Sequence, residues 1–270
     1  MPLALTNLAW NPQDDAEVAR LLHQHGVAAI DIAPTKYFAD PLRAMPAEVR
    51  RVRQWWADQG IAISGMQSLL HGAQGLNLFG TPVVQQRMLD HLRAVCDIAA
   101  GLGASRLVFG SPANRDRSGL SDAQAQAMAL DFFGRLGDVA AAAGVQIGIE
   151  AVATRYRSNF LIDTASTLAM VQTLAHPALA ITLDTANLHL NAESIDAVLP
   201  AHAACIGPIH ASEPDLVPLG DGGVPHETLG AAIRRHLPEA LVCVEILLPR
   251  GESWQAAIAR SLTLARRCYG

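Results

Sequence analysis

The sequence predicts one α/β domain over residues 1–270, folded as a single (β/α)₈ (TIM) barrel. Eight short apolar runs alternate with amphipathic helical stretches along the chain, as stacked βα units do. In addition, 50% of the residues are hydrophobic and 17% are charged, against roughly 25% charged in an average soluble domain. No linker rich in Pro, Gly or Ser divides the chain. This composition favours strands that are buried on both faces, as in a parallel barrel.

The expected elements follow one another with ordinary start and stop signals. The expected strands cover residues 3–10, 27–32, 61–67, 106–110, 145–150, 180–184, 206–210 and 241–246. The expected helices cover residues 14–26, 46–60, 81–101, 121–144, 163–174, 194–199 and 253–268. Ser121 and Gln124 have capping-box spacing, and Gly26, Gly60 and Gly144 end their helical segments.

The expected strand ends are spaced as whole βα units. From Asp31 onward they follow at intervals of 36, 43, 40, 34, 26 and 35 residues. No sequence repeat accompanies this spacing, so the period belongs to the architecture. A doubly wound open sheet is the alternative fold, but the first strand lacks the G-x-G-x-x-G turn of a dinucleotide-binding version.

Charge and cysteine content exclude several classes of protein. Twenty Lys and Arg against 25 Asp and Glu give a net charge of −5 and a pI near 6.0, so the chain lacks the basic character of nucleic-acid binders. The widely spaced cysteines indicate core thiols in a reducing compartment: Cys96, Cys205, Cys243 and Cys268. The sequence lacks a cationic leader and the roughly 18 uninterrupted apolar residues of a membrane helix. We therefore expect a cytoplasmic protein that binds neither nucleic acid nor membrane.

Chemically active residues stand at the ends of the last four expected strands. Glu150, Asp184, His210 and Glu245 fall there in chain order. The carboxyl ends of barrel strands form the active-site face, so these side chains are expected to meet at one mouth. Singly, each could cap a helix, pair with an arginine or serve as a loop hydrogen-bonder. Three converging carboxylates without a cation would repel one another and lose hydration, so the set predicts a bound divalent metal.

The donor types narrow the choice of metal. Three carboxylates and one imidazole suit Mn²⁺ first, with Mg²⁺ and Co²⁺ as alternatives, and leave positions open for substrate oxygens or water. A structural zinc ion would prefer cysteine and histidine ligands.

Other polar residues on the same rim are candidates for substrate binding. Asn7, Asp31 and Gln67 end the first three strands and could bind hydroxyl groups or water, although loop hydrogen bonds account equally well for Asn7 and Asp31. Arg155 follows Glu150 and could clamp an anionic group, but a solvated basic loop explains it better.

Two further features have weaker functional interpretations. The glycine-rich segment 220–223 could form a backbone nest for an anion, or it could be a plain loop before the helix start at Pro225. Trp55 and Trp56 are adjacent on one helix, so one is expected in the core. The other is expected at its edge, where it suggests a contact between subunits of a homo-oligomer.

The ligand order and three short segments resemble one known superfamily. Glu150, Asp184, His210 and Glu245, with LDTAN at 183–187, IHASE at 209–213 and LGDGG at 219–223, resemble the xylose-isomerase-like sugar isomerases and epimerases, especially the ketose 3-epimerases. The resemblance covers essentially the whole chain. It implies a small carbohydrate substrate and a metal that polarises the substrate carbonyl and stabilises an enediolate. It also implies that Glu150 and Glu245 transfer protons on opposite faces of a bound ketose.

The sequence departs from the ketose 3-epimerase pattern at three positions. That group commonly carries a His, an Arg and a Glu where this chain has Asn187, Leu216 and Tyr156. These positions usually handle substrate hydroxyl groups. We therefore expect Asn187 to contact the substrate through its amide, together with Gln67, Asn7 and Arg155 as the other candidates.

Other functions remain as alternatives. Dehydratases of inososes or dehydroshikimate belong to the same superfamily and begin with the same proton abstraction, and Asn187 and Leu216 keep this reaction open. A sugar-binding barrel without catalysis is less consistent with four retained ligand types in a chain with 5% aromatic residues. Apurinic endonucleases share the barrel, but they combine a larger zinc cluster with a basic face that this acidic chain lacks.

Overall fold

The computed structural model describes residues 1–270 and contains a closed barrel of eight parallel strands. The strands are β1 (Leu3–Thr6), β2 (Ala29–Ile32), β3 (Ala62–Met66), β4 (Arg106–Phe109), β5 (Gln146–Glu150), β6 (Leu179–Asp184), β7 (Ile206–Ser212) and β8 (Val242–Glu245). Each strand pairs with the next along the chain, and β8 pairs with β1. The predicted (β/α)₈ barrel is confirmed. A doubly wound sheet is excluded, because an open sheet has two unpaired edges.

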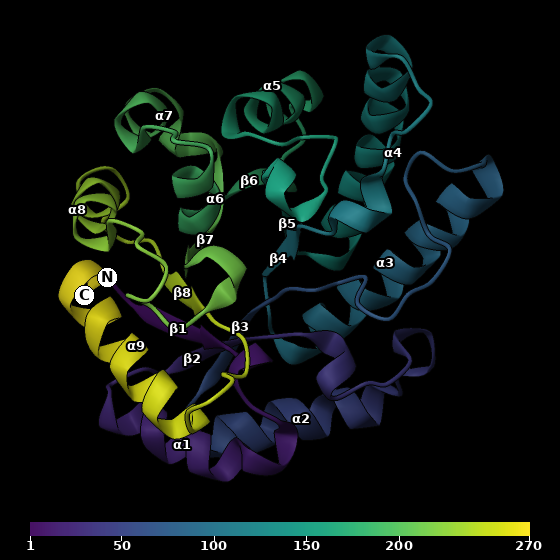
Figure 1. Ribbon diagram of the computed structural model, residues 1–270. Helices are drawn as coiled ribbons and strands as arrows, with labels where there is room; N and C mark the ends of the chain where they lie inside the picture. Colours follow the sequence, from purple (N-terminus) through teal and green to yellow (C-terminus); the bar gives the residue numbers. More distant parts are fainter.

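Helices surround this barrel as an outer layer (Figure 1). They are α1 (Asp15–Gln24), α2 (Pro46–Asp58), α3 (Pro82–Leu102), α4 (Asp122–Ala143), α5 (Thr164–Leu174), α6 (Thr185–Leu190), α7 (Ile195–His202), α8 (His226–His236) and α9 (Trp254–Tyr269). The capping box of Ser121 and Gln124 is present at the start of α4. Gly144 ends that helix in the left-handed conformation, with φ 69°.

The first strand is shorter than the sequence predicts. It ends at Thr6, because Asn7–Ala9 form a 3₁₀ turn. Trp10, the expected last residue, instead lies in the core, where its indole N–H donates to Asp15 at 2.7 Å. The turn sets the direction of the Asn7 side chain, which matters for the site described below.

The connection between the sixth and seventh strands contains one more helix than expected. Helix α6 begins directly after Asp184, whose side chain accepts the backbone N–H of Asn187 at 2.8 Å and so caps the helix. The expected short helix near 194–199 is α7, which follows it. This cap fixes the start of helix α6 at the end of β6.

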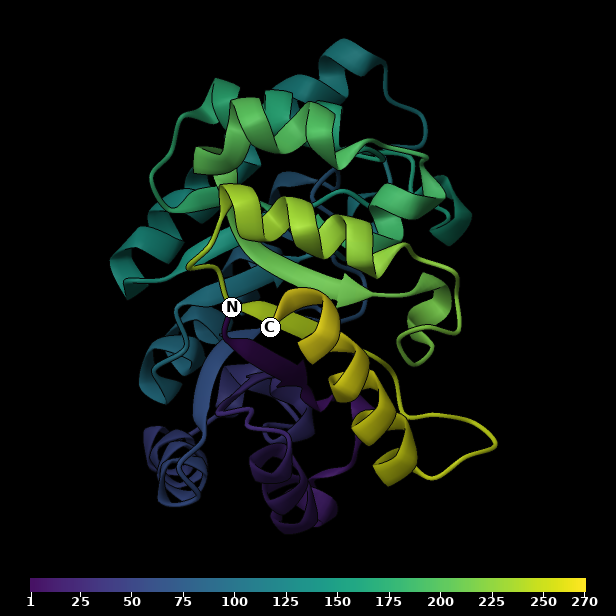
Figure 2. The same cartoon turned by 90° about the vertical axis from the view of Figure 1, so that its left-hand side faces the viewer.

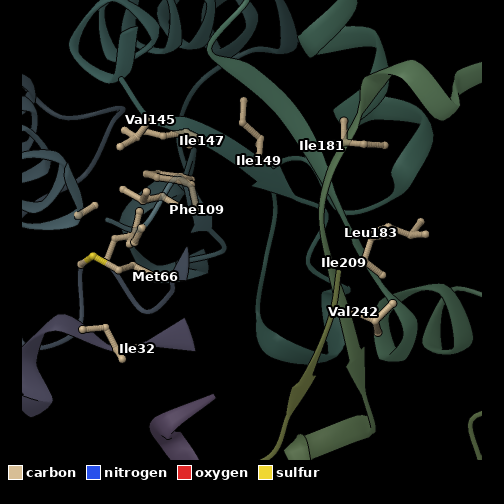
Figure 3. Packing of buried hydrophobic residues seen from close by; sticks show 14 of the residues in the cluster. Ile32, Met66, Phe109, Val145, Ile147, Ile149, Ile181, Leu183, Ile209 and Val242 are labelled. Carbon is tan, nitrogen blue, oxygen red and sulfur yellow. The ribbon is translucent and has the colours of Figure 1, made fainter. Parts of the chain in front are cut away.

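The main hydrophobic core lies between the barrel and the helices (Figure 3). Successive strand residues point to opposite faces, and residues such as Ile147 and Ile149 of β5 belong to the large outer cluster. A separate small cluster of Ala4, Ala29 and Cys243 comes from alternate positions of three strands and lies inside the barrel. Small residues inside the barrel leave room there for polar side chains.

All strands run in the same direction, so the loops that follow them gather at one face of the barrel (Figure 2). The segment between β8 and α9 projects at this face. The four cysteines are unpaired, and no helix combines the length and apolarity needed to cross a membrane. Trp56 is buried and Trp55 is half-buried beside it, as the helix pattern predicts.

Candidate active site

Four strands of the second half of the barrel deliver one polar side chain each to the mouth. Glu150 ends β5, Asp184 ends β6, His210 lies in β7 and Glu245 ends β8. Each has the inward parity of its strand, as Glu245 has with Cys243 of the inner cluster. One ligand atom from each of the four lies within 4.8 Å of the others. The structure thus brings together the four residues that were expected to meet.

Negative charge is crowded and poorly hydrated in this cluster. Burial, reinforced by the charges of Asp184 and Glu245, raises the pKa of Glu150 to about 8. Burial and the charge of Glu245 likewise raise the pKa of Asp184. Burial alone would lower the pKa of His210, but the adjacent Glu245 carboxylate raises it to about 9. The cluster therefore favours a cation, either bound protons or a metal ion.

The residues fit a divalent metal ion. Three carboxylates and an imidazole are oxygen and nitrogen donors of the kind that bind Mn²⁺, Mg²⁺, Co²⁺ or Zn²⁺. His210 Nδ1 lies 3.0 Å from Glu245 Oε2, and its Nε2 atom is buried without a hydrogen-bond partner. A bound cation would relieve the repulsion that raises the carboxylate pKa values.

A cavity of about 380 Å³ opens beside the cluster. Its walls include three of the four expected ligands, and two more carboxylates come from the loop after β7: Glu150, Asp184, Glu213, Asp215 and Glu245. The lining contains no Lys, Arg or His. Apolar groups such as Val108, Val152, Leu216 and Leu247 form much of the remaining wall. The volume suits a small molecule whose polar atoms face the carboxylates.

Two of the expected substrate-binding residues line this cavity. Gln67 is 1% exposed, and both its amide oxygen and its amide nitrogen lack a hydrogen-bond partner. Asn187 also lines the cavity, but its Nδ2 atom donates to Asp184 Oδ1 at 2.9 Å and its Oδ1 atom accepts the N–H of Ala153 at 2.9 Å. One N–H of the Asn187 amide remains free to meet a substrate. The other two departures from the epimerase pattern, Tyr156 and Leu216, are cavity residues as well.

The other rim candidates lie outside the cavity lining. Asn7 is buried, and its Oδ1 atom accepts the N–H of Ala33 at 2.7 Å, because the 3₁₀ turn after β1 directs it toward the neighbouring loop. Arg155 is exposed and pairs with Asp215, with Nε 3.3 Å from Oδ1. This places Arg155 behind a cavity carboxylate, where its charge is already matched.

Asp31 points into the barrel below the mouth. It accepts the hydroxyl of Ser64 at 2.6 Å and lies 3.7 Å from the guanidinium of Arg106. Asp31 is thus a buried carboxylate that contacts Ser64 and Arg106, and it does not line the cavity. This contact is not visible in the sequence, because Arg106 lies at the start of β4, far from Asp31 along the chain.

Arg115 is a second residue whose position the sequence does not reveal. It is fully buried, and its guanidinium donates to the carbonyl oxygens of Glu150 at 2.8 Å and Gly110 at 3.2 Å. Burial lowers its pKa to about 10, with the charge of Glu150 opposing that shift. In the sequence, Arg115 stands among polar residues typical of a solvated loop. Only the return of that loop over the end of β5 reveals its place.

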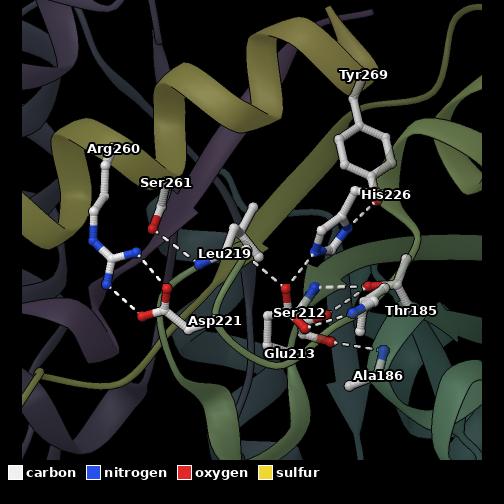
Figure 4. A network of polar contacts seen from close by, with 12 residues as sticks. Thr185, Ala186, Ser212, Glu213, Leu219, Asp221, His226, Arg260, Ser261 and Tyr269 are labelled. Carbon is white, nitrogen blue, oxygen red and sulfur yellow. Dashed lines mark hydrogen bonds and ion pairs between the residues drawn. The ribbon is translucent and has the colours of Figure 1, made fainter.

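The glycine-rich segment after β7 is organised around Glu213 (Figure 4). Glu213 accepts the N–H groups of Gly220 at 2.7 Å and Val224 at 3.0 Å, and it contacts His226 at 3.1 Å. His226 in turn contacts the hydroxyl of Tyr269 in α9 at 2.6 Å. Burial would raise the pKa of Glu213, but these hydrogen bonds hold it below its usual value. The anion that these loop N–H groups bind is therefore a side chain of the protein itself.

A closed parallel barrel with a carboxylate and histidine cluster at the carboxyl ends of its strands is the arrangement of a barrel enzyme with a possible metal site. The family model of the xylose isomerase-like TIM barrels matches residues 19–268. The chain belongs to this family, as the resemblance predicted.

Known relatives agree with this assignment. A ketose 3-epimerase from Arthrobacter globiformis is 26% identical over 247 residues, which cover 87% of this chain and 80% of that protein. A D-psicose 3-epimerase from Clostridium cellulolyticum H10, solved with D-tagatose, superimposes with a TM-score of 0.79 at 17% identity and covers 100% of this chain and 99% of that chain. The IOLI protein, solved with a bound zinc atom, superimposes with a TM-score of 0.76 at 16% identity and covers 98% of this chain and 97% of that chain.

Proposed function

We propose that this protein is a divalent-metal-dependent isomerase or epimerase of a small ketose or a related polyol. The observation that carries the proposal is the convergence of Glu150, Asp184, His210 and Glu245 within 4.8 Å beside a cavity of sugar-sized volume. The ketose 3-epimerase relative supports the reaction class. A cytoplasmic location and Mn²⁺ as the native ion remain parts of the proposal, as does a homo-oligomer contact at Trp55.

The chain's own groups divide the work of proton transfer. A divalent ion held by the four residues would polarise a substrate carbonyl and make the hydrogen on the adjacent carbon more acidic. Glu150 and Glu245 come from β5 and β8 and both line the cavity. In this proposal one of them removes the proton and the other returns a proton to the opposite face of that carbon.

The charge of the cavity favours a neutral substrate. Five carboxylates and no cationic side chain line it, and the nearby Arg155 is already paired with Asp215. A phosphate or carboxylate on the substrate would meet this negative field even with one divalent ion present. Gln67 offers an unpaired donor and acceptor to hydroxyl groups. These features favour an unphosphorylated ketose or inosose over a dehydroshikimate-type acid.

Incubation of the Mn²⁺-loaded protein with a panel of neutral ketoses and inososes in deuterated water tests the proposal. An epimerase or isomerase should incorporate solvent deuterium and leave the product otherwise isomeric with the substrate. A product lighter by one water would establish the dehydratase alternative instead. No turnover and no exchange across the panel would refute the proposed reaction.

Single substitutions of the two glutamates test their roles. Glu150→Gln and Glu245→Gln should each abolish turnover with metal saturating, while one of them can retain exchange of the substrate hydrogen if proton removal survives. Glu239→Gln is the matched control, because Glu239 is exposed in the turn before β8, at the opposite end of the barrel. Full activity in either active-site variant would rule out the paired-glutamate mechanism.

A further inference from the structure

The carboxylate of Asp184 is already extensively hydrogen-bonded by the protein. Its Oδ1 atom accepts the backbone N–H of Asn187 at 2.8 Å and the side-chain Nδ2 of the same residue at 2.9 Å. Its Oδ2 atom accepts the hydroxyl of Ser212. An ionised carboxylate offers about four lone-pair positions, two on each oxygen. Three are filled here, so one position on Oδ2 remains.

Each donor is itself held in the orientation that serves Asp184. The Oδ1 atom of Asn187 accepts the N–H of Ala153, which fixes the amide so that its nitrogen faces Asp184. The Oγ atom of Ser212 accepts the N–H of Ala186 at 3.2 Å, which leaves its hydroxyl hydrogen for Asp184. Both side chains are buried, so water does not readily replace these bonds.

We propose that Asn187 and Ser212 are positioning residues for Asp184: the two donors of Asn187 occupy Oδ1 and restrict Asp184 to binding a cation through Oδ2, and Ser212 orients that Oδ2 atom. The consequence is selectivity: Ca²⁺ favours six to eight oxygen ligands and often takes both oxygens of a carboxylate, whereas Mg²⁺ and Mn²⁺ are satisfied by octahedral sites. The restriction therefore favours the smaller ions over Ca²⁺. This inference rests on the metal site of the proposed function and adds what selects its ion.

Asn187 also connects two of the ligand-bearing loops. Ala153 lies three residues after Glu150, so the amide of Asn187 joins the loop after β5 to the ligand at the end of β6. Removing the side-chain amide should free one of the two occupied positions on Oδ1 of Asp184 and loosen this connection, while the backbone N–H of residue 187 stays on the other position. Its substrate-facing N–H would affect KM instead, so metal affinity and KM separate the two roles of this residue.

Calorimetric titration with Mn²⁺ alone and with Ca²⁺ alone tests the inference without any substrate. Asn187→Ala and Ser212→Ala should each weaken Mn²⁺ binding by about 10- to 100-fold, the range typical for residues that orient metal ligands. In Asn187→Ala, where Oδ1 of Asp184 loses one of its two donors, Ca²⁺ binding should weaken less or improve, so the ratio of Mn²⁺ affinity to Ca²⁺ affinity should fall. Ser111→Ala is the matched control, because Ser111 lines the same cavity without contacting Asp184. Thermal unfolding of each metal-free variant checks that it is folded.

The possible results separate this inference from the proposed function. Parental affinities for both ions in folded Asn187→Ala and Ser212→Ala proteins would overturn the inference while leaving the proposed reaction intact. Loss of selectivity in Asn187→Ala, together with a parent protein that turns over no ketose or inosose, would support the inference and refute the proposed reaction. A parent chain that binds neither ion would overturn both.

Discussion

Replacing Gly110 with alanine should disable the site while leaving the fold intact. An added Cβ atom would lie 2.0 Å from Glu150 Oε2, whereas ordinary contact begins at 3.4 Å, so the two atoms must separate by about 1.4 Å. The backbone of Gly110 is not in the left-handed region, and the clashing atom is the end of a side chain. The carboxylate of Glu150 will therefore move rather than the barrel. A displacement of about 1 Å at reacting groups costs on the order of 10²-fold in rate.

The measurement combines Mn²⁺ titration, turnover and thermal unfolding of Gly110→Ala beside a second glycine variant. Gly134 lies within α4, and its added Cβ would meet only Leu174 at 3.9 Å. Gly134→Ala should keep parental metal binding and turnover and should gain up to about 1 kcal/mol of stability, since alanine favours the helix. If Gly110→Ala binds Mn²⁺ and turns over substrate like the parent, the working position of Glu150 is not the one described here.

Three further predictions concern the surroundings of the cluster. In the metal-free protein, the pKa is raised to about 8 for Glu150 and to about 9 for His210, so the folded state binds more protons than the unfolded state. The free energy of unfolding should therefore fall as pH rises from about 5 to 9, and a flat or rising Tm over that range would contradict this. Arg115→Met removes two part-buried hydrogen bonds to main-chain carbonyls and should cost about 1–3 kcal/mol in total, measured by urea unfolding; a loss below about 1 kcal/mol would refute it. Glu213→Ala should speed amide hydrogen exchange in segment 219–226, and unchanged protection would show that Glu213 does not hold that loop.

The convergence of the four polar side chains could be predicted because it depends on two regular properties of a parallel barrel. Strand ends share one face, and the two-residue alternation sends Glu150, Asp184, His210 and Glu245 inward once the strands are placed. Both properties are visible in a single sequence. The same regularity predicts eight strands. The structure confirms all eight, and the errors lie at the strand ends.

Residues that depend on irregular backbone could not be placed in the same way. Asn7 and Gln67 both follow barrel strands, yet only Gln67 reaches the cavity, because a 3₁₀ turn redirects Asn7. Arg115 has polar neighbours in sequence and becomes buried only when its loop returns over β5. Glu213 belongs to the segment 209–213 that carries the family resemblance. Its hydrogen bonds to Gly220 and Val224 form only because the loop after β7 folds back on it, and no local sequence pattern predicts that path.

All four residues of the cluster come from β5–β8, so the two halves of the barrel contribute different parts of the site. The half built from β1–β4 provides none of these four residues, but it forms one wall of the cavity with Val108 of β4 and with Gln67, Ser68, Ser111 and Pro112 of the loops after β3 and β4. Exchange of the loop after β3 can therefore alter this wall of the cavity without changing any of the four residues. For protein engineering, the exposed positions within residues 68–81 are the ones to diversify, while Arg115 and the four residues of the second half of the barrel are kept.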